Sequence, residues 1–542
     1  MFEREDVPRL FGLPPGVDFP RAVIAGLMQR LAGAPPEQVA RTEIFVNTRR
    51  MQRRLRSLFE DGGARLLPRI RLVTDLAAEE ALDAIPPPVP PLRQRLERAQ
   101  LIARLLDREP DLAPRSSVFD LADSLAGLMD EMRGEGVAPQ VIRGLDVSDQ
   151  SGHWQRSLKF VSLVDEFLRA ERAPDVEGRQ RLVVERLADR WTERPPRHPV
   201  LVAGSTGSRG ATALFMRAVA RLPQGAVILP GVDFDLPETV WSELHDAMTG
   251  EDHPQFRFAR LIRALDLTPS AIRRWVDIEP PNAPRNRLVS LALRPAPVTD
   301  HWMTEAPRLE GIDRAVQAVS LVEAPSIRAE ASTVALALRG AVEDGRVAAL
   351  ITPDRVLTRQ VTAALNRWGI VPDDSAGAPL HLSAPGRFLR LVASLFGQVL
   401  TAQALLALLK HPLTNTGSAE RGAHLLWTRE LELKLRRFGP PFPQAGDLAE
   451  WAAGGEPART AWAGWLAGLL AGLESVGTRS LASHLDHHIR LAESLAQGPE
   501  GTGSGALWNE AAGIEAERWI AELRQEAGFG GTMTPAEYAS LI

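Results

Sequence analysis

The sequence predicts an α/β protein with two parallel-sheet segments and large helical insertions. Short apolar runs rich in β-branched residues occur in two regions, and each run precedes a pattern typical of a helix. Inside the first region and after the second, apolar residues recur at helical spacing with almost no strand pattern. The chain has 542 residues, of which 44% are hydrophobic and 24% charged, so several globular domains are expected.

The first β-α-β unit is predicted at residues 43–73. The run Glu43–Val46 has the composition of a strand, and it is followed by Asn47 and Thr48, residue types that often cap helix N-termini. A helix is expected over Arg49–Glu60 and a second strand over Ile70–Val73. Two strands joined by a helix are typical of a parallel sheet.

A helical block interrupts this first domain. The proline cluster Pro86–Pro91 marks a boundary, because it fits neither a helix nor a central strand. Helical spacing then follows, and the α/β pattern resumes with a strand at 200–203, a helix at 211–221 and a strand at 226–230. The sequence therefore predicts a first domain from residues 1–91 and 196–300, with residues 92–195 as the insert.

A second α/β domain is predicted for residues 315–395. Its expected strands are 319–322 and 348–352, and its expected helices are 326–342 and 354–368. Residues 396–542 are rich in leucine and alanine at helical spacing and predict a further helical insert.

The composition excludes several kinds of chemistry. Cysteine is absent, which removes disulfides, thiol nucleophiles and cysteine-held metal clusters. Only three of the 63 basic residues are lysine and none follows a glycine, so no Walker A nucleotide site is present. No secretory or membrane-spanning pattern occurs. We expect a cytoplasmic protein without membrane contact, and no cofactor or metal in this segment.

Basic charge is concentrated near the N-terminus. Residues 41–71 contain nine arginines against three acidic residues, although the net charge of the chain is −5. The predicted helix start combines two polar residues with four arginines: Asn47, Thr48, Arg49, Arg50, Arg53 and Arg54. Such a helix, beginning at the edge of a sheet, is suited to phosphate groups. The alternative is a solvated basic surface.

Three other patterns favour structural interpretations. The glycine- and hydroxyl-rich loop Gly204–Gly210 could hold an anion, but it also fits an ordinary strand-to-helix connection. His484 and His488 share a helix face that could bind zinc, yet an exposed helix in acidic surroundings is the favoured interpretation. The pair Asp373-Asp374 is more typical of a turn than of a metal site.

Two segments carry a family resemblance. FVNTRRMQRRL (45–55) is similar to the single-strand-contacting motif of superfamily 1 helicases, and LITPDRVLTRQVTAALNRWGI (350–370) to their fourth motif. The supporting segments are PPGVDFPRAV (14–23), RLLPRIRLVTDLA (65–77), AGSTGSRGATALFMRAVARLPQGAVILPGVD (203–233) and PDDSAGAPLHLSAPGRFLRL (372–391). Together they make the chain resemble the alphaproteobacterial type of the AddB family, which works beside AddA in the helicase-nuclease for double-strand break repair.

The resemblance implies two superfamily 1 helicase-like parallel-sheet domains, a heterodimer with the AddA subunit, and contact with single-stranded and double-stranded DNA ends. It adds Arg359, at the fourth-motif position, to the expected DNA-binding residues. The nucleotide loop of an active motor would fall at Leu13–Arg21 and its acidic pair at Gly204-Ser205, where the required lysine and carboxylates are absent. We therefore expect a catalytically inactive segment that scans single-stranded DNA, with the family's nuclease domain and iron–sulfur cluster beyond residue 542.

Two alternatives remain. The chain could be a structural partner subunit without DNA contact, in which the arginine cluster is surface charge. It could also be the N-terminal part of a nuclease whose catalytic domain lies beyond residue 542. Single-strand binding that depends on salt would separate the first alternative from the leading hypothesis.

Overall fold

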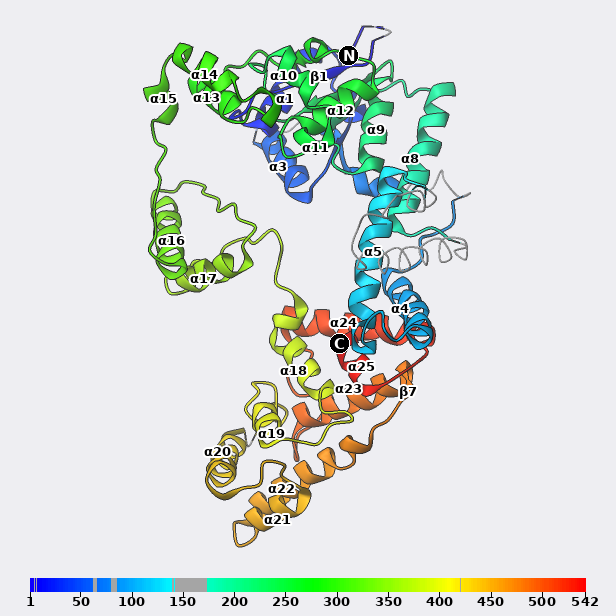
Figure 1. The fold of residues 1–542 in the computed structure, drawn as a ribbon, viewed down its shortest axis with the longest axis vertical. Coiled ribbons are helices and arrows are strands. Elements are labelled where there is room, and N and C mark those ends of the chain that lie inside the picture. The colour runs from blue at the N-terminus through cyan, green and yellow to red at the C-terminus, as the bar shows by residue number, and fades with distance from the viewer. Residues whose placement is uncertain are drawn as a thin grey trace. The chain divides into compact units, whose positions relative to one another are not determined.

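The computed structural model describes residues 1–542 except 4, 6, 62–65, 79–84, 139–140, 142–172 and 420. Part of the predicted helical insert therefore lies outside the described residues. The described chain divides into two compact units, which are residues 1–94 with 122–318, and residues 95–121 with 319–542 (Figure 1). No helix of the described residues is long and apolar enough to cross a membrane.

The first unit contains a six-stranded sheet in the order β3-β2-β4-β5-β1-β6, and every neighbouring pair is parallel. The strands are β1 (Leu10–Gly12), β2 (Glu43–Val46), β3 (Arg69–Leu72), β4 (Val200–Ala203), β5 (Gly225–Leu229) and β6 (Arg273–Arg274). The predicted strands near 44, 70, 200 and 226 are confirmed as members of one sheet. The sequence did not predict β1 and β6, which are only three and two residues long.

Helices cover both faces of this sheet, as a parallel sheet requires. On one face, α1 (Phe19–Arg30) and α3 (Arg49–Glu60) pack on a core that includes Ile44 and Val46. On the other face, α8 (Val176–Glu193), α9 (Gly210–Ala220) and α12 (Phe256–Ala264) pack on a core that includes Phe45. Successive side chains of β2 point to opposite faces of the sheet, so they pack in two separate cores.

Adjacent strands β2 and β4 send their following helices to opposite faces. The chain leaves β2 into α3 and leaves β4 into α9, and these helices belong to different cores. This reversal is the topological switch point, where ligands of open α/β sheets usually bind, at the carboxyl ends of the strands.

The remaining helices of residues 1–318 are short or belong to the predicted helical insert. Helices α2, α10 and α11 span Glu37–Arg41, Glu238–Glu243 and Ala247–Gly250, and α13, α14 and α15 span Ala283–Ala292, His301–Glu305 and Ile312–Val316. Helices α4 (Pro91–Arg108) and α5 (Val118–Glu135) confirm helical structure in the described part of the predicted insert, and the division into units falls within both of them.

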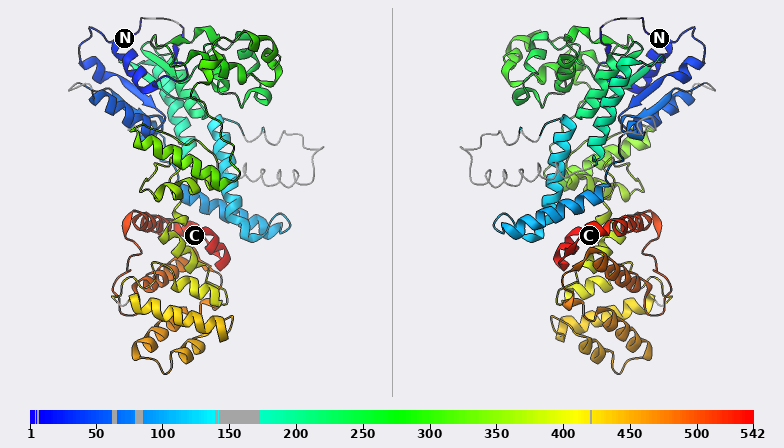
Figure 2. Two further views of the ribbon diagram at one scale, coloured as in Figure 1. Left: turned by 90° about the vertical axis from the view of Figure 1, so that its left-hand side faces the viewer. Right: turned by 90° about the vertical axis from the view of Figure 1, so that its right-hand side faces the viewer.

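The second unit is almost entirely helical (Figure 2). Its helices are α16 (Ile327–Glu343), α17 (Arg355–Asn366), α18 (Ala384–Ala393), α19 (Ala402–Leu409), α20 (Arg421–Phe438), α21 (Ala445–Ala452), α22 (Pro457–Leu470), α23 (Leu481–Gln497), α24 (Glu510–Glu526) and α25 (Pro535–Leu541). Two-residue strands β7 (Arg479–Ser480) and β8 (Thr532–Met533) pair antiparallel.

The predicted strands at 319–322 and 348–352 are wrong. Both segments have neither helix nor strand geometry, although the helices predicted beside them form as α16 and α17. A strand needs a hydrogen-bonding neighbour, and within the described chain no backbone hydrogen bond links either segment to another. Leu321 and Ile351 are 89% and 94% exposed. The second predicted parallel sheet is therefore not formed by the described residues.

Candidate nucleic-acid interface

The candidate site lies where the ends of β2 and β4 meet the starts of α1 and α3. Gly204 follows β4 and has a φ of +79°, a backbone conformation that favours glycine. A Cβ atom at this position would lie 3.1 Å from Cε1 of Phe19 and 3.4 Å from Cε of Met51. The first turns of α1 and α3 therefore converge on the strand-to-helix loop that follows β4.

Helix α3 begins as the sequence predicted. Thr48 is its N-cap residue, and the Thr48 side chain accepts a hydrogen bond of 3.2 Å from the backbone N–H of Met51. Asn47 and Thr48 are both exposed, as are the arginines of the first two turns: Arg49, Arg50, Arg53 and Arg54. Because residues four apart are neighbours on a helix, these arginines form two adjacent rows. We call the four arginines, together with Asn47 and Thr48, the α3 basic surface.

The carboxylate of Asp18 contacts the α3 basic surface. Oδ2 of Asp18 lies 3.9 Å from Nη2 of Arg54 and 3.5 Å from Nε of Arg21 on α1. Among the described residues, no hydrogen bond or ion pair occupies the side chains of Arg49 and Arg53. Asp18 and Arg21 were not among the residues predicted from the sequence, although a capping aspartate two residues before a proline is a helix-start signal.

Arg359, the remaining predicted DNA-binding residue, belongs to the second unit. It is exposed on α17, and no ion-pair partner for it exists within the described part of the chain. Helix α17 itself begins at Asp354, whose side chain accepts from the backbone N–H groups of Val356 and Leu357. The structure thus describes Arg359 and the α3 basic surface as parts of different units.

The loop between β1 and α1 is held by contacts with the protein's own groups. Asp18 caps α1, and its Oδ1 accepts a hydrogen bond of 3.2 Å from the backbone N–H of Arg21. Pro20 has no N–H to donate. Asn286 of α13 fixes the loop by donating to the carbonyl oxygen of Pro15 at 3.0 Å. A negative side chain therefore occupies the helix N-terminus that would otherwise attract a phosphate.

The predicted anion loop after β4 has its own internal contact. Ser205 is buried, and its Oγ accepts a hydrogen bond of 3.3 Å from the backbone N–H of Gly207. Arg209, at the N-cap position of α9, pairs with Glu177 at 2.7 Å. Neither contact involves the α3 basic surface.

The histidine pair on α23 corrects the sequence interpretation. His484 and His488 are fully buried, whereas an exposed helix was expected. The ring of His488 is held between the hydroxyl of Tyr538 at 2.7 Å and the carbonyl oxygen of Leu389 at 2.8 Å. Nε2–H must donate to the carbonyl, so Nδ1 accepts from the hydroxyl. Burial lowers the pKa of His488 to about 4, which keeps the ring neutral.

The remaining candidate metal ligands, His484 and Asp374, also have structural roles. Nε2 of His484 contacts the carbonyl oxygen of Met533 at 3.0 Å, and Asp374 accepts from the backbone N–H of Ala376 while pairing with Arg355. The described residues contain no group of three or more suitable side chains that could hold a metal ion. The turn interpretation of Asp374 is confirmed.

Comparison with known proteins adds no family assignment. Neither the protein-family models nor the curated proteins gave a match to this chain. The fold and the site define the class: an α/β protein with a six-stranded parallel sheet and an arginine-rich helix at the carboxyl edge of that sheet.

Proposed function

We propose that this chain is a non-motor, helicase-like subunit that binds and scans single-stranded DNA at the carboxyl edge of its parallel sheet. Its partner would be an ATP-driven AddA-type subunit in a helicase-nuclease for double-strand break repair. The observation that carries the proposal is the α3 basic surface, which begins at the switch point between β2 and β4.

The chemistry of this surface suits a phosphate backbone. Arginine presents a planar set of donors that matches phosphate oxygens, and it keeps its charge at all physiological pH values. Arg49 and Arg53 need not break an ion pair with a described residue before they contact a phosphate. Asn47 and Thr48 add uncharged polar groups at the same helix end. Contacts of this kind position a strand without reading its bases.

The non-motor part of the proposal is supported by the loop between β1 and α1. ATP binding at that position would require backbone donors and a lysine near the phosphates. Here Asp18 supplies a negative charge and accepts the available N–H of Arg21. Movement along DNA would therefore depend on the partner subunit.

The test is single-strand binding by fluorescence anisotropy across a series of salt concentrations. The parent chain is compared with a variant in which Arg49, Arg50 and Arg53 are alanine. The variant should bind more weakly to all sequences, and its log-log salt slope should flatten by about 0.7 for each phosphate that the variant no longer neutralises. Arg263, an exposed arginine at the end of α12, provides a matched control when changed to alanine.

Equal binding by the triple variant and the parent at about 0.15 M salt would contradict the proposal. Absence of single-strand binding by the parent would favour a structural partner subunit, in which the same arginines are surface charge.

A further inference from the structure

A small cavity lies among α5, α8, α9 and α12, on the sheet face opposite α3. Its volume is about 180 Å³, and four arginines line it: Arg181, Arg217, Arg257 and Arg260. Glu135, at the end of α5, is the one carboxylate among the described lining residues. We call this space the arginine cavity. Its lining carries more positive than negative charge.

Two helices build the arginine cavity with the same residue spacing. Gly210, Ala213, Leu214 and Arg217 line it from α9, at positions i, i+3, i+4 and i+7. Arg257, Arg260, Leu261 and Ala264 line it from α12 at the same spacing. Residues at this spacing share one helix face. The small residues Gly210, Ala213 and Ala264 leave space between the two helices, and the guanidinium groups lie around it.

The positive charge of the arginine cavity is only partly compensated. Arg181 is paired with Glu185 at 2.9 Å. By contrast, Arg260 lies 3.7 Å from Glu135 and Arg257 lies 3.5 Å from Glu251, both longer than a strong charged hydrogen bond. Arg217 forms no ion pair with any described residue, and its buried Nε has no hydrogen-bond partner. A buried donor on a charged group is costly when it is unpaired. The incompletely paired arginines therefore favour the binding of an anion in the cavity.

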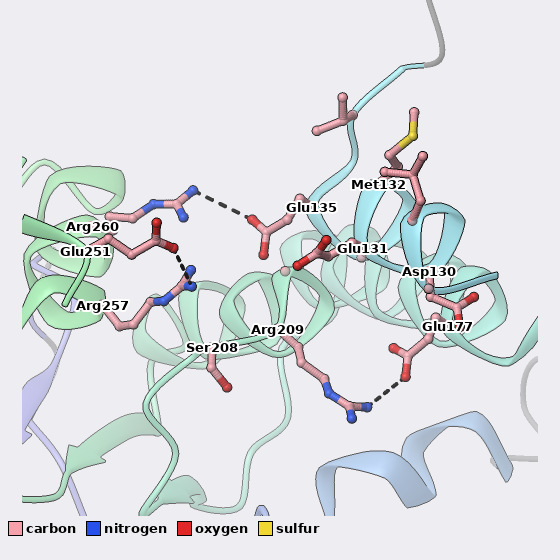
Figure 3. Close-up of a pocket in the computed structure, with 15 residues that line it drawn as sticks. Asp130, Glu131, Met132, Glu135, Glu177, Ser208, Arg209, Glu251, Arg257 and Arg260 are labelled. Atoms are coloured by element: carbon pink, nitrogen blue, oxygen red, sulfur yellow. Dashed lines mark hydrogen bonds and ion pairs between the residues drawn. The ribbon is translucent and has the colours of Figure 1, made fainter. Parts of the chain in front are cut away.

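Acidic side chains next to the arginine cavity disfavour a long polyanion. A larger hollow of about 810 Å³ shares Glu135, Gly210, Arg257 and Arg260 with the arginine cavity (Figure 3). Acidic side chains also line this hollow: Asp130, Glu131, Glu177 and Glu251. Like charges would repel a long polyanion such as DNA. A compact anion can reach the arginines without crossing so extended an acidic surface.

We propose that the arginine cavity binds a small phosphate-type anion, either inorganic phosphate or pyrophosphate. The guanidinium groups of Arg217, Arg257 and Arg260 would supply charged hydrogen bonds, and the N-terminus of the 11-residue helix α9 adds a favourable dipole. This site is separate from the α3 basic surface, and it does not depend on the proposed DNA binding.

The test is calorimetric titration of the whole chain with pyrophosphate and with inorganic phosphate, with chloride keeping the ionic strength constant. The parent should show saturable binding to at least one anion. Changing Arg217 and Arg257 together to glutamine should weaken binding at least about tenfold, because each guanidinium contributes charged hydrogen bonds. Arg263→Gln, an exposed change on the same helix as Arg257, is the matched control and should bind as the parent does.

Lack of saturable binding by the parent, or equal binding by the double variant, would overturn this inference. Arg217→Lys keeps the charge but not the planar donors, and it should bind more weakly than the parent and more tightly than Arg217→Gln. If the double variant does not fold, the comparison of Arg217→Lys with Arg217→Gln tests anion binding instead. The alanine variant of Arg49, Arg50 and Arg53 should bind the anion normally, so failure of either proposal can be recognised separately.

Discussion

Asp18 and Arg54 connect the first helices of two successive β-α units, with Oδ2 of Asp18 lying 3.9 Å from Nη2 of Arg54. The same carboxylate caps α1 through the backbone N–H of Arg21. Asp18 therefore stabilises a helix end and reduces the positive potential of the α3 basic surface. These two effects can be separated by mutation.

Asp18→Asn should tighten single-strand DNA binding about two- to fivefold at low salt, because it removes the negative charge next to Arg54. Asparagine caps helices about as well as aspartate, so stability should change by less than about 0.5 kcal/mol. Anisotropy titrations and urea unfolding measure the two quantities. Unchanged or weaker DNA affinity in a normally folded variant would contradict the expected electrostatic effect.

Thr48→Ala should destabilise the first unit by about 1 kcal/mol, because the backbone N–H of Met51 loses its side-chain acceptor. Urea unfolding followed by circular dichroism measures the change in stability. Thr48→Ser keeps the hydroxyl and provides the control, with nearly normal stability expected. If alanine and serine behaved alike, the cap would not contribute to stability.

The chain alone should neither bind ATP tightly nor hydrolyse it. Asp18 occupies the N-terminus of α1, and the sequence offers no glycine-lysine pair for the phosphates. A phosphate-release assay with and without single-stranded DNA measures turnover. Rates near about 1 to 100 per second, in a preparation free of any motor partner, would show that the chain is itself a motor.

Stability of the second unit should fall as the pH decreases from about 6.5 to about 4. Burial lowers the pKa of His488 to about 4 in the folded chain, whereas an unfolded histidine has a pKa near 6.5. The unfolded state therefore takes up the proton first, and His488 alone accounts for up to about 3 kcal/mol across this range. Unfolding in urea at a series of pH values measures how the free energy of unfolding changes with pH.

His488→Gln should reduce this pH dependence, while His245→Gln, at an exposed position in the first unit, should leave it unchanged. Burial also lowers the pKa of His411 to about 4, so some dependence should remain in the His488 variant. If the stability of His488→Gln depended on pH as that of the parent does, His488 would have the same pKa in the folded and unfolded chains.

Local signals explain what the sequence could predict. Helix α3 begins and ends at the predicted residues, because a capping threonine and a strongly amphipathic arginine-rich run coincide there. The strands β4 and β5 are buried runs of four and five residues without charge, and β2 has three buried apolar residues after Glu43, so all three were recognisable. By contrast, β1 has three residues and β6 consists of two arginines, so hydrogen bonding to neighbouring strands defines them.

Long-range contacts explain what the sequence could not predict. The burial of His488 depends on Leu389 and Tyr538, which are 99 and 50 residues away along the chain. The arginine cavity likewise combines residues of α5, α8, α9 and α12, and no local motif marks Arg181 or Arg217 as neighbours of Arg257. The composition of residues 319–322 and 348–352 favours a strand locally, but the described residues provide no strand to pair with them, so the strand prediction failed.

Residues 319–322 and 348–352 should be cleaved early by proteases. Proteases bind their substrates as extended chain with free N–H and C=O groups, and both segments offer such groups next to exposed side chains. Residues 319–322 also begin the second unit along this part of the chain. Brief digestion should therefore cut there before it cuts the buried strand β4, and it should yield a fragment that ends near residue 320 and retains the whole six-stranded sheet.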